Sequence, residues 1–447
     1  MIYSRYNFLW RSEQFGYMIY NSLTNCFAQI EKDIFEMLSN VKLGKEINLE
    51  SIDEETLDIM NSSKIFVESD DDELLSLKFK KYSHRFNQRF LSLTIAPTLD
   101  CNFKCSYCFE DPGKKNYMSL ATENKLIDFI KKFNNLDFLH VSWYGGEPLM
   151  AEKTIQRLTK SLINFGLNYS ASITTNGYLL NKKFINQLES LRINDIQVTI
   201  DGPEEIHNAR RPHKNRGGSF NTIIDNLHNL SVYKKDKRIA IKVRVNIDTT
   251  NEQCYADIYN YIKNIDKSIY VYPGFVQEVT TCQSNSSCNF DRFRKASFKI
   301  SNFKERSILD EYFYPRLSGS ECMARHINSF LIGPEGEVYK CWSDVGQQER
   351  VIGSITDDSI TNFTLMTRYI LGADPFDNKD CKDCFFLPIC GGGCPYFALK
   401  NHYEDGQYDI CYIAKDCLQE FLELHYEKKM KAGDNLNLIA SANKSVV

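Results

Sequence analysis

Three cysteines in one short stretch are the residues of this chain best suited to chemistry. Cys101, Cys105 and Cys108 follow the spacing C-x3-C-x2-C. Cysteine thiolates bind iron–sulfur clusters, and three thiolates on a four-iron cluster keep one iron open to another ligand. Metal centres that do chemistry keep such an open position, whereas structural sites are closed. A zinc loop lacking one ligand and a set of buried free thiols are the alternatives, but zinc loops favour paired C-x2-C units. The spacing therefore favours an open cluster.

A second group of cysteines lies in the C-terminal part of the chain. Its members are Cys322, Cys341, Cys381, Cys384, Cys390, Cys394, Cys411 and Cys417. The first two flank a predicted hairpin over 329–340, whose centre carries Gly333, Pro334 and Gly336. Glycines 391–393 lie between two of the cysteines and let backbone N–H groups approach an inorganic sulfide. Zinc knuckles are the alternative, but they favour two C-x2-C pairs, so this group also favours clusters.

Length, composition and charge narrow the class of protein. The chain has 447 residues, of which 43% are hydrophobic and 25% charged, as expected for a globular protein of several domains. A net charge of −4 argues against a nucleic-acid binder, because no net basic field would neutralise phosphates. The N-terminus has no apolar signal segment, and no apolar run is long enough to span a bilayer. Fifteen cysteines without an export signal indicate cluster ligation in a reducing compartment. We therefore expect a cytoplasmic protein without a nucleic-acid or membrane partner.

Residues 90–280 alternate between strand and helix patterns. The strand-like runs lie at 91–96, 138–144, 171–175, 196–200, 240–247 and 269–275. The helical patterns lie at 119–133, 152–165, 182–191, 220–230 and 252–264. Repeated βα units form parallel sheets with right-handed crossovers, so we predict an α/β fold with a partial (β/α)6 TIM-like barrel. Chemistry in such barrels gathers at the C-terminal ends of the strands, where the loop of three cysteines would lie.

Four further segments flank this barrel. Residues 1–89 show a strand pair, two helices and a strand, which predicts a winged-helix-like module, and the acidic run 70–73 is expected to be a turn or linker. Residues 281–316 would bridge to a cysteine-rich domain over 317–426. Residues 427–447 are polar and predict a flexible tail.

These features together resemble a radical S-adenosylmethionine (SAM) enzyme with a C-terminal SPASM domain. The resemblance covers roughly residues 90–420. It includes Tyr107 just before the third cysteine and the motif Gly145-Gly146-Glu147-Pro148 after the second strand. The C-terminal cysteines match the SPASM spacing, beginning with C-x13-G-x4-C at Cys322. The resemblance implies that SAM binds the open iron and is cleaved by one electron to a 5′-deoxyadenosyl radical.

The resemblance also implies which residues contact SAM. They are Tyr107, Gly145, Gly146, Glu147, Asn176, Thr199, Arg211 and Asn246. Tyr107 would contact the adenine through its backbone, and residues 145–147 would receive the methionine amine. Thr199 would meet the ribose or carboxylate, and the guanidinium of Arg211 would pair with the carboxylate. The structural alternatives are a tight turn at 145–146 and a solvated basic face at 210–216.

Two auxiliary 4Fe–4S clusters are implied in addition to the SAM-binding cluster, which makes three. One would be bound by Cys381, Cys384, Cys390 and Cys411, with Cys417 as the alternative to Cys411. The other would be bound by Cys322, Cys341 and Cys394. No cysteine occurs in the few residues before Cys322, so this second cluster would have an open iron or take Cys282 or Cys288.

The implied function is maturation of a ribosomally made peptide. The N-terminal module resembles elements that bind a leader peptide by adding it to a sheet edge. The radical would then install a thioether or carbon–carbon cross-link, with flavodoxin or ferredoxin as electron donor. One alternative is an anaerobic sulfatase maturase that makes formylglycine, but such enzymes have an acidic residue where this chain has Trp342. Another is a non-enzymatic iron–sulfur electron carrier, which leaves the Gly-Gly-Glu-Pro motif unexplained.

Overall fold

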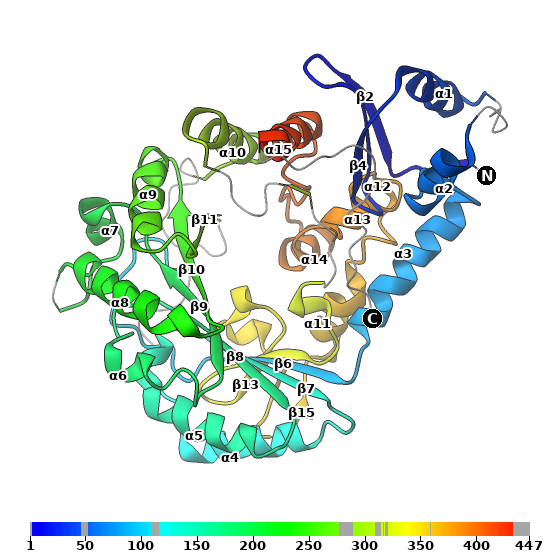
Figure 1. The fold of residues 1–447 in the computed structure, drawn as a ribbon. Coiled ribbons are helices and arrows are strands. Elements are labelled where there is room, and N and C mark those ends of the chain that lie inside the picture. Colours follow the sequence, from blue (N-terminus) through cyan, green and yellow to red (C-terminus); the bar gives the residue numbers. More distant parts are fainter. Residues whose placement is uncertain are drawn as a thin grey trace. The chain divides into compact units, whose positions relative to one another are not determined.

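The computed structural model describes residues 2–45, 52–108, 116–215, 217–276, 289–308, 314–315, 317, 321–357 and 359–431. The chain divides into two compact units (Figure 1). The barrel unit comprises residues 86–295 and 323–372. The cysteine-rich unit comprises residues 1–85, 296–322 and 373–447. Within the described ranges, no helix is both long and apolar enough to cross a membrane.

The barrel unit is built on a ten-stranded sheet in the order β11-β10-β9-β8-β7-β6-β12-β13-β14-β15. Six strands from the predicted βα units are parallel neighbours, which confirms the partial barrel. They are β6 (Phe90–Ile95), β7 (Phe138–Trp143), β8 (Asn168–Thr175), β9 (Ile193–Thr199), β10 (Ala240–Ile247) and β11 (Tyr270–Phe275). The helices between them are α4 (Leu120–Lys131), α5 (Glu152–Ile163), α6 (Lys182–Ile185), α7 (Glu204–Arg210), α8 (Phe220–Tyr233) and α9 (Tyr255–Ile265). The predicted helix 182–191 is too long, because α6 ends at Ile185 and turns follow.

The two faces of this parallel sheet differ in polarity. Side chains on the face toward the helices are apolar and almost fully buried, as at Leu93, Val141 and Val243. Alternate residues on the other face are polar and partly exposed, as at Gln197 and Arg244. Parallel sheets are normally covered and apolar on both faces. The polar inner face therefore indicates a barrel interior that accepts polar groups.

The predicted hairpin at 329–340 is confirmed and extends the barrel sheet. Strand β12 (Ser329–Ile332) pairs in parallel with β6 and antiparallel with β13 (Glu337–Tyr339). Strands β14 (Gly353–Ser354) and β15 (Ser359–Ile360) complete this edge. The short helix α11 (Phe363–Thr367) follows. Much of the segment assigned to the C-terminal domain thus belongs to the barrel unit, because its strands continue the ladder of the barrel.

The cysteine-rich unit begins with an antiparallel sheet of β2 (Asn7–Ser12), β3 (Gly16–Asn21) and β4 (Cys26–Ile30). The short strands β1 (Ile2–Tyr3) and β5 (Phe66–Val67) pair with each other. Helices α1 (Lys32–Lys42) and α2 (Glu54–Ser62) cover one face of the larger sheet, and a core forms there from Ile19, Ala28, Leu38, Met60, Ile65 and Phe66. Strand β4 was not predicted, because its pattern ran into that of α1.

The other face of the N-terminal sheet packs against the C-terminal cysteine segment. One core contains Trp10, Met18, Tyr20 and Phe27 together with Phe386, Ile389, Leu418, Leu422 and Tyr426. The indole N–H of Trp10 donates to Glu423 at 3.0 Å, and the hydroxyl of Ser22 donates to the carbonyl of Phe385 at 2.6 Å. The N-terminal module and the cysteine segment therefore share one hydrophobic core. The remaining helices of this unit are α10 (Arg292–Arg306), α12 (Lys379–Lys382), α13 (Leu387–Cys390), α14 (Pro395–Tyr403) and α15 (Leu418–Lys431).

The prediction for the acidic run is wrong, and the first residues of the predicted tail are helical. The acidic run is not a linker but the first turn of α3 (Asp70–Arg85), where carboxylates interact favourably with the N-terminal end of the helix dipole. The hydroxyl of Ser69 accepts a hydrogen bond from the N–H of Asp72 at 3.0 Å and caps this helix. At the other terminus, α15 continues to Lys431, so part of the expected tail is helical.

Candidate active site

The loop of three cysteines begins directly after β6, at the C-terminal edge of the parallel sheet. Cys101 and Cys105 are half-buried and Cys108 is exposed. Burial is the main cause that raises the pKa of Cys101 to about 12, and Glu147 and the thiols of Cys105 and Cys108 add to it. The effect of Cys105 and Cys108 on Cys101 is consistent with three thiols that lie in one loop. No group of three or more His, Cys, Asp and Glu side chains in the described ranges is arranged for a single metal ion, and a four-iron cluster instead binds each cysteine through a different iron.

The backbone of this loop is tied to the segment that follows α7. The N–H of Ser106 donates to the carbonyl of Arg210 at 3.1 Å, and that of Lys104 donates to Pro212 at 3.0 Å. The N–H of Lys214 returns a bond to the carbonyl of Asn102 at 2.8 Å. These bonds fix the loop against the residues that carry the two arginines of the site.

The Gly-Gly-Glu motif lies against the start of the same loop. The N–H of Gly146 donates to Thr98 at 3.2 Å, and that of Glu147 donates to the carbonyl of Asp100 at 2.9 Å. Gly145 has a φ of +111°, which side chains rarely allow. A Cβ on Gly146 would lie 2.5 Å from the carbonyl oxygen of Leu99. Both glycines are therefore required for the close approach of two backbones.

The side chain of Glu147 links the ends of β7 and β8. Its carboxylate is fully buried and accepts hydrogen bonds from the hydroxyl of Thr175 at 2.7 Å and from the N–H of Asn176 at 2.7 Å. It also accepts from the N–H of Leu149 at 3.0 Å. Burial raises the pKa of Glu147, while these hydrogen bonds oppose the rise. The carboxylate thus acts as a positioning group for Asn176, whose amide donates to Asn102 in the cysteine loop at 2.7 Å.

Tyr107 joins the cysteine loop to two other residues that the sequence assigned to SAM. Its hydroxyl accepts hydrogen bonds from Arg211 at 2.5 Å and from the side chain of Asn246 at 2.9 Å. The guanidinium of Arg210 lies 5.2 Å from the centre of the Tyr107 ring. Thr199 ends β9 and pairs in register with Arg244 of β10. The structure therefore brings most of the assigned residues to one edge of the sheet.

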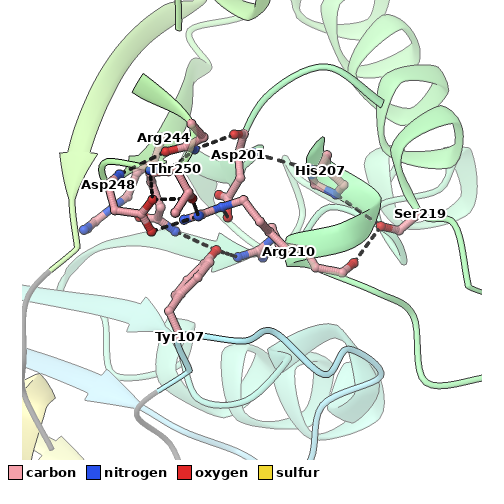
Figure 2. A network of polar contacts seen from close by, with 11 residues as sticks. Tyr107, Asp201, His207, Arg210, Ser219, Arg244, Asp248 and Thr250 are labelled. Carbon is pink, nitrogen blue, oxygen red and sulfur yellow. Dashed lines mark hydrogen bonds and ion pairs between the residues drawn. The ribbon is translucent and has the colours of Figure 1, made fainter. Parts of the chain in front are cut away.

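The sequence reasoning missed a buried ion network beside Tyr107. Arg210 donates to Asp248 and to the hydroxyl of Thr250, both at 2.8 Å, and its Nε lies 3.4 Å from Asp201 (Figure 2). A solvated basic face was the structural alternative for 210–216, but the side chain of Arg210 is only 11% exposed. The signal that could have identified it is Asp248, which follows the end of β10 as Asp201 follows the end of β9. His207 is neutral and structural here, because burial lowers its pKa to about 3.

Several buried polar atoms at this edge have no hydrogen-bond partner among the residues that the structure describes. They are Asn102 Nδ2, Asp201 Oδ1, Arg210 Nη2 and Arg211 Nε. A buried polar atom without a hydrogen bond costs about 1–3 kcal/mol, so native proteins rarely leave several together. The three thiols fit a bound iron–sulfur cluster. The unpartnered donors and the carboxylate oxygen fit a polar ligand that carries both a negative and a positive charge.

Four of the C-terminal thiols also share a site. Burial raises the pKa of Cys381 to about 11, and the thiols of Cys390, Cys384 and Cys411 add to it. Burial raises the pKa of Cys390, while the backbone N–H groups of Gly392 and Gly393 oppose the rise. Cys417 instead packs in an apolar core with Ala296, Ala414, Phe421 and Leu424, which favours Cys411 as the fourth ligand.

The other auxiliary cluster stays a prediction. Cys322 and Cys394 belong to the cysteine-rich unit, and Cys341 belongs to the barrel unit. Cys282 and Cys288 lie outside the described residues.

Replacing Tyr107 with phenylalanine should weaken SAM binding, because Arg211 and Asn246 lose their shared acceptor. Loss of a hydrogen bond to a charged donor costs about 1.5–3 kcal/mol, so we expect the dissociation constant of SAM to rise at least about tenfold. Equilibrium binding to the reconstituted protein measures it. The matched control is Tyr261→Phe, because Tyr261 is 47% exposed. An unchanged affinity in Y107F would show that this network does not position SAM.

Comparisons with known proteins give the class of this protein. Residues 95–264 match the family model of the Radical SAM superfamily. The chain is 25% identical over 383 residues to the cysteine-type anaerobic sulfatase-maturating enzyme of Clostridium novyi, covering 73% of this chain and 97% of that protein. It is also 25% identical over 393 residues to the serine-type enzyme of Bacteroides thetaiotaomicron, covering 77% and 91%. The fold and the site therefore define an enzyme that uses SAM together with an iron–sulfur cluster.

Solved structures agree with this class. The native enzyme anSMEcpe with bound AdoMet has a TM-score of 0.61 at 19% identity, over 77% of this chain and all of that chain. SuiB of Streptococcus suis bound to S-adenosylmethionine has a TM-score of 0.54 at 16% identity, over 92% of this chain and 100% of that chain. Residues 95–264 therefore form a Radical SAM domain, as the sequence resemblance implied, and the longer chain shares the fold of anSMEcpe and SuiB.

Proposed function

We propose that this enzyme cross-links a ribosomally made precursor peptide after binding its leader. The observation that carries the proposal is the N-terminal sheet, in which β2 and β4 are the outer strands and each pairs with β3 alone among the described strands, as a sheet that adds a peptide strand requires. The fold of SuiB covers 92% of this chain, whereas that of anSMEcpe covers 77%. SuiB has also been solved bound to its precursor peptide SuiA. The additional length shared with SuiB supports a leader-binding role.

The cysteine loop would hold the cluster that reacts with SAM. A reduced 4Fe–4S cluster bound by Cys101, Cys105 and Cys108 would supply the electron that cleaves SAM to a carbon radical. Arg211 would pair with the methionine carboxylate through its Nε, which has no hydrogen-bond partner among the described residues. Its Nη1 donates to Tyr107. Because the carboxylate of Glu147 is occupied by protein donors, the methionine amine would meet backbone atoms of residues 145–147. The polar inner face of the sheet would receive the peptide backbone beside this centre.

The peptide reaction removes two hydrogens. One hydrogen atom passes from a peptide C–H bond to the SAM-derived radical, and the second leaves the cysteine S–H or the aromatic C–H as a proton. The new bond would join the two peptide atoms, and an auxiliary cluster held by the C-terminal cysteines would accept the remaining electron. Flavodoxin or ferredoxin would supply the first electron in the cytoplasm.

Formylglycine formation is the second candidate, and the identity to two sulfatase-maturating enzymes favours it. The residue after Cys341 opposes it. Trp342 occupies the acidic position expected of such an enzyme, and its ring packs 4.6 Å from that of Tyr144. Asp344, the next carboxylate, is fully buried and lies 3.9 Å from Arg350. Neither residue offers an exposed carboxylate next to Cys341.

Mass spectrometry of the product separates the two candidates. Reconstituted enzyme, SAM and a reductant are incubated without oxygen with the small peptide encoded beside the gene, and with a peptide that carries a sulfatase cysteine motif. We expect the first peptide to become lighter by two hydrogen atoms and the second to remain unchanged. Loss of the cysteine sulfur from the second peptide would establish the formylglycine reaction instead.

A further inference from the structure

One face of α3 carries a regular row of buried side chains. Glu73, Leu77, Lys81 and Arg85 are four residues apart and at most 5% exposed. Two of them are cations, although lysine and arginine are rarely buried without compensating charge. The preceding residue Lys80 faces solvent. This row is the side of α3 that packs into the cysteine-rich unit.

The row contacts the segments that carry the auxiliary-cluster cysteines. Leu77 shares an apolar core with Tyr6 and Leu387, and Cys381 packs against that core. One helical turn past Lys81, Arg85 donates to both oxygens of Glu321 at 2.7 and 2.6 Å. Glu321 directly precedes Cys322. Lys81 therefore lies between two contacts with cysteine-bearing segments.

The charges around Lys81 do not cancel without it. Arg85 is bound by both Glu321 and Asp374, and all three side chains are at most 5% exposed. One cation and two carboxylates leave one negative charge, which Lys81 offsets. Burial lowers the pKa of Lys81 to about 8, while Glu321 and the thiol of Cys390 oppose the decrease. Lys81 is thus a buried cation within electrostatic reach of a proposed cluster ligand.

We propose that Lys81 raises the reduction potential of the auxiliary cluster bound by Cys381, Cys384, Cys390 and Cys411. Reduction adds one negative charge to a cluster that four thiolates already make negative. Net charge and burial around the sulfurs are two ways in which a protein adjusts such a potential. A buried cation is weakly screened and stabilises the reduced state. The inference rests on the proposed cluster, and it gives the N-terminal module an electrostatic role besides peptide binding.

This role fits the electron balance of the proposed reaction. The auxiliary cluster would accept the electron that remains after the cross-link forms. A higher potential makes the cluster a better acceptor. The cation comes from the helix of the N-terminal module, so the module and the acceptor cluster form one functional unit.

A redox titration tests the proposal without any peptide. The full chain carries C101A, C105A, C108A and C341A, which leaves one cluster with four cysteine ligands, and the titration is followed by electron paramagnetic resonance. We expect Lys81→Met to lower the equilibrium constant for reduction about tenfold, which is about 59 mV for one electron. Lys81→Arg keeps the charge and should restore the potential. Lys80→Met is the matched control and should not change it.

Two results would overturn the proposal. One is a K81M protein with full iron content and an unchanged potential. The other is a K81R protein shifted as far as K81M, which would indicate a packing effect. If K81M does not bind the cluster, the yield of cluster reconstitution becomes the readout. The proposal then requires full loading of K81R, and poor loading of K81R would contradict it. Absence of peptide modification bears only on the proposed function, because the potential is measured separately.

Discussion

Replacing Gly146 with alanine is expected to reduce SAM cleavage by about 100-fold or more. The added Cβ would lie 2.5 Å from the carbonyl oxygen of Leu99 and closer still to that of Asp100, so backbone must move. Asp100 directly precedes Cys101, and its carbonyl accepts the N–H of Glu147. A displacement of about 1 Å at reacting groups can reduce a rate about 100-fold. Formation of 5′-deoxyadenosine by the reconstituted protein measures the effect.

The matched control for this substitution is Gly166→Ala. Gly166 lies in the turn before β8 of the same barrel, and a Cβ there meets nothing within 4 Å. Its φ of +73° costs an alanine about 1–2 kcal/mol of stability without moving the cysteine loop. G166A should therefore keep SAM cleavage near the wild-type rate. Equal losses in both variants would show that the close approach at Gly146 does not set the geometry of the loop.

Replacing Asp374 with asparagine is expected to lower the free energy of unfolding by about 3–5 kcal/mol. The reason is that one of the two carboxylates that neutralise buried positive charge around Arg85 is lost. Asp374 is fully buried and binds Arg85, the hydroxyl of Tyr82 at 3.0 Å and the N–H of Phe376 at 2.9 Å. Urea denaturation followed by circular dichroism measures the change. Asp377→Asn is the control, because Asp377 is exposed and lies 3.7 Å from Lys78 in a surface pair worth at most about 1 kcal/mol. Similar losses in D374N and D377N would contradict a structural role for the buried network.

The barrel and the cysteine loop could be predicted because their signals are local. Each parallel strand is a short apolar run between turn residues, and all six were located within a few residues. Cys101, Cys105 and Cys108 are so close in sequence that they lie in a single loop. The structure places that loop at the C-terminal edge of the parallel sheet, as predicted. The Gly-Gly-Glu motif was predicted to contact SAM. In the structure, the backbone of Gly146 and Glu147 is hydrogen-bonded to the start of the cysteine loop, and the side chain of Glu147 bonds to the end of β8.

The parts that were missed depend on pairing between distant segments. Nothing local in residues 329–340 shows that the hairpin continues the barrel sheet, because the parallel pairing of β12 with β6 joins residues far apart. The acidic start of α3 has the composition of a linker, and only its buried row shows that it packs as a helix. The ion network of Arg210 likewise depends on carboxylates after two different strands. Sequence spacing cannot show which of several arginines turns inward.

Deuterium transfer tests the central claim most directly. The small peptide encoded beside the gene is produced with deuterium at its carbon-bound positions and incubated anoxically with reconstituted enzyme, SAM and reductant. We expect 5′-deoxyadenosine that carries one deuterium, together with a peptide lighter by the two removed hydrogens, and neither product with the C105A variant. Formation of 5′-deoxyadenosine without deuterium, beside an unchanged peptide, would contradict the claim that this enzyme modifies that peptide.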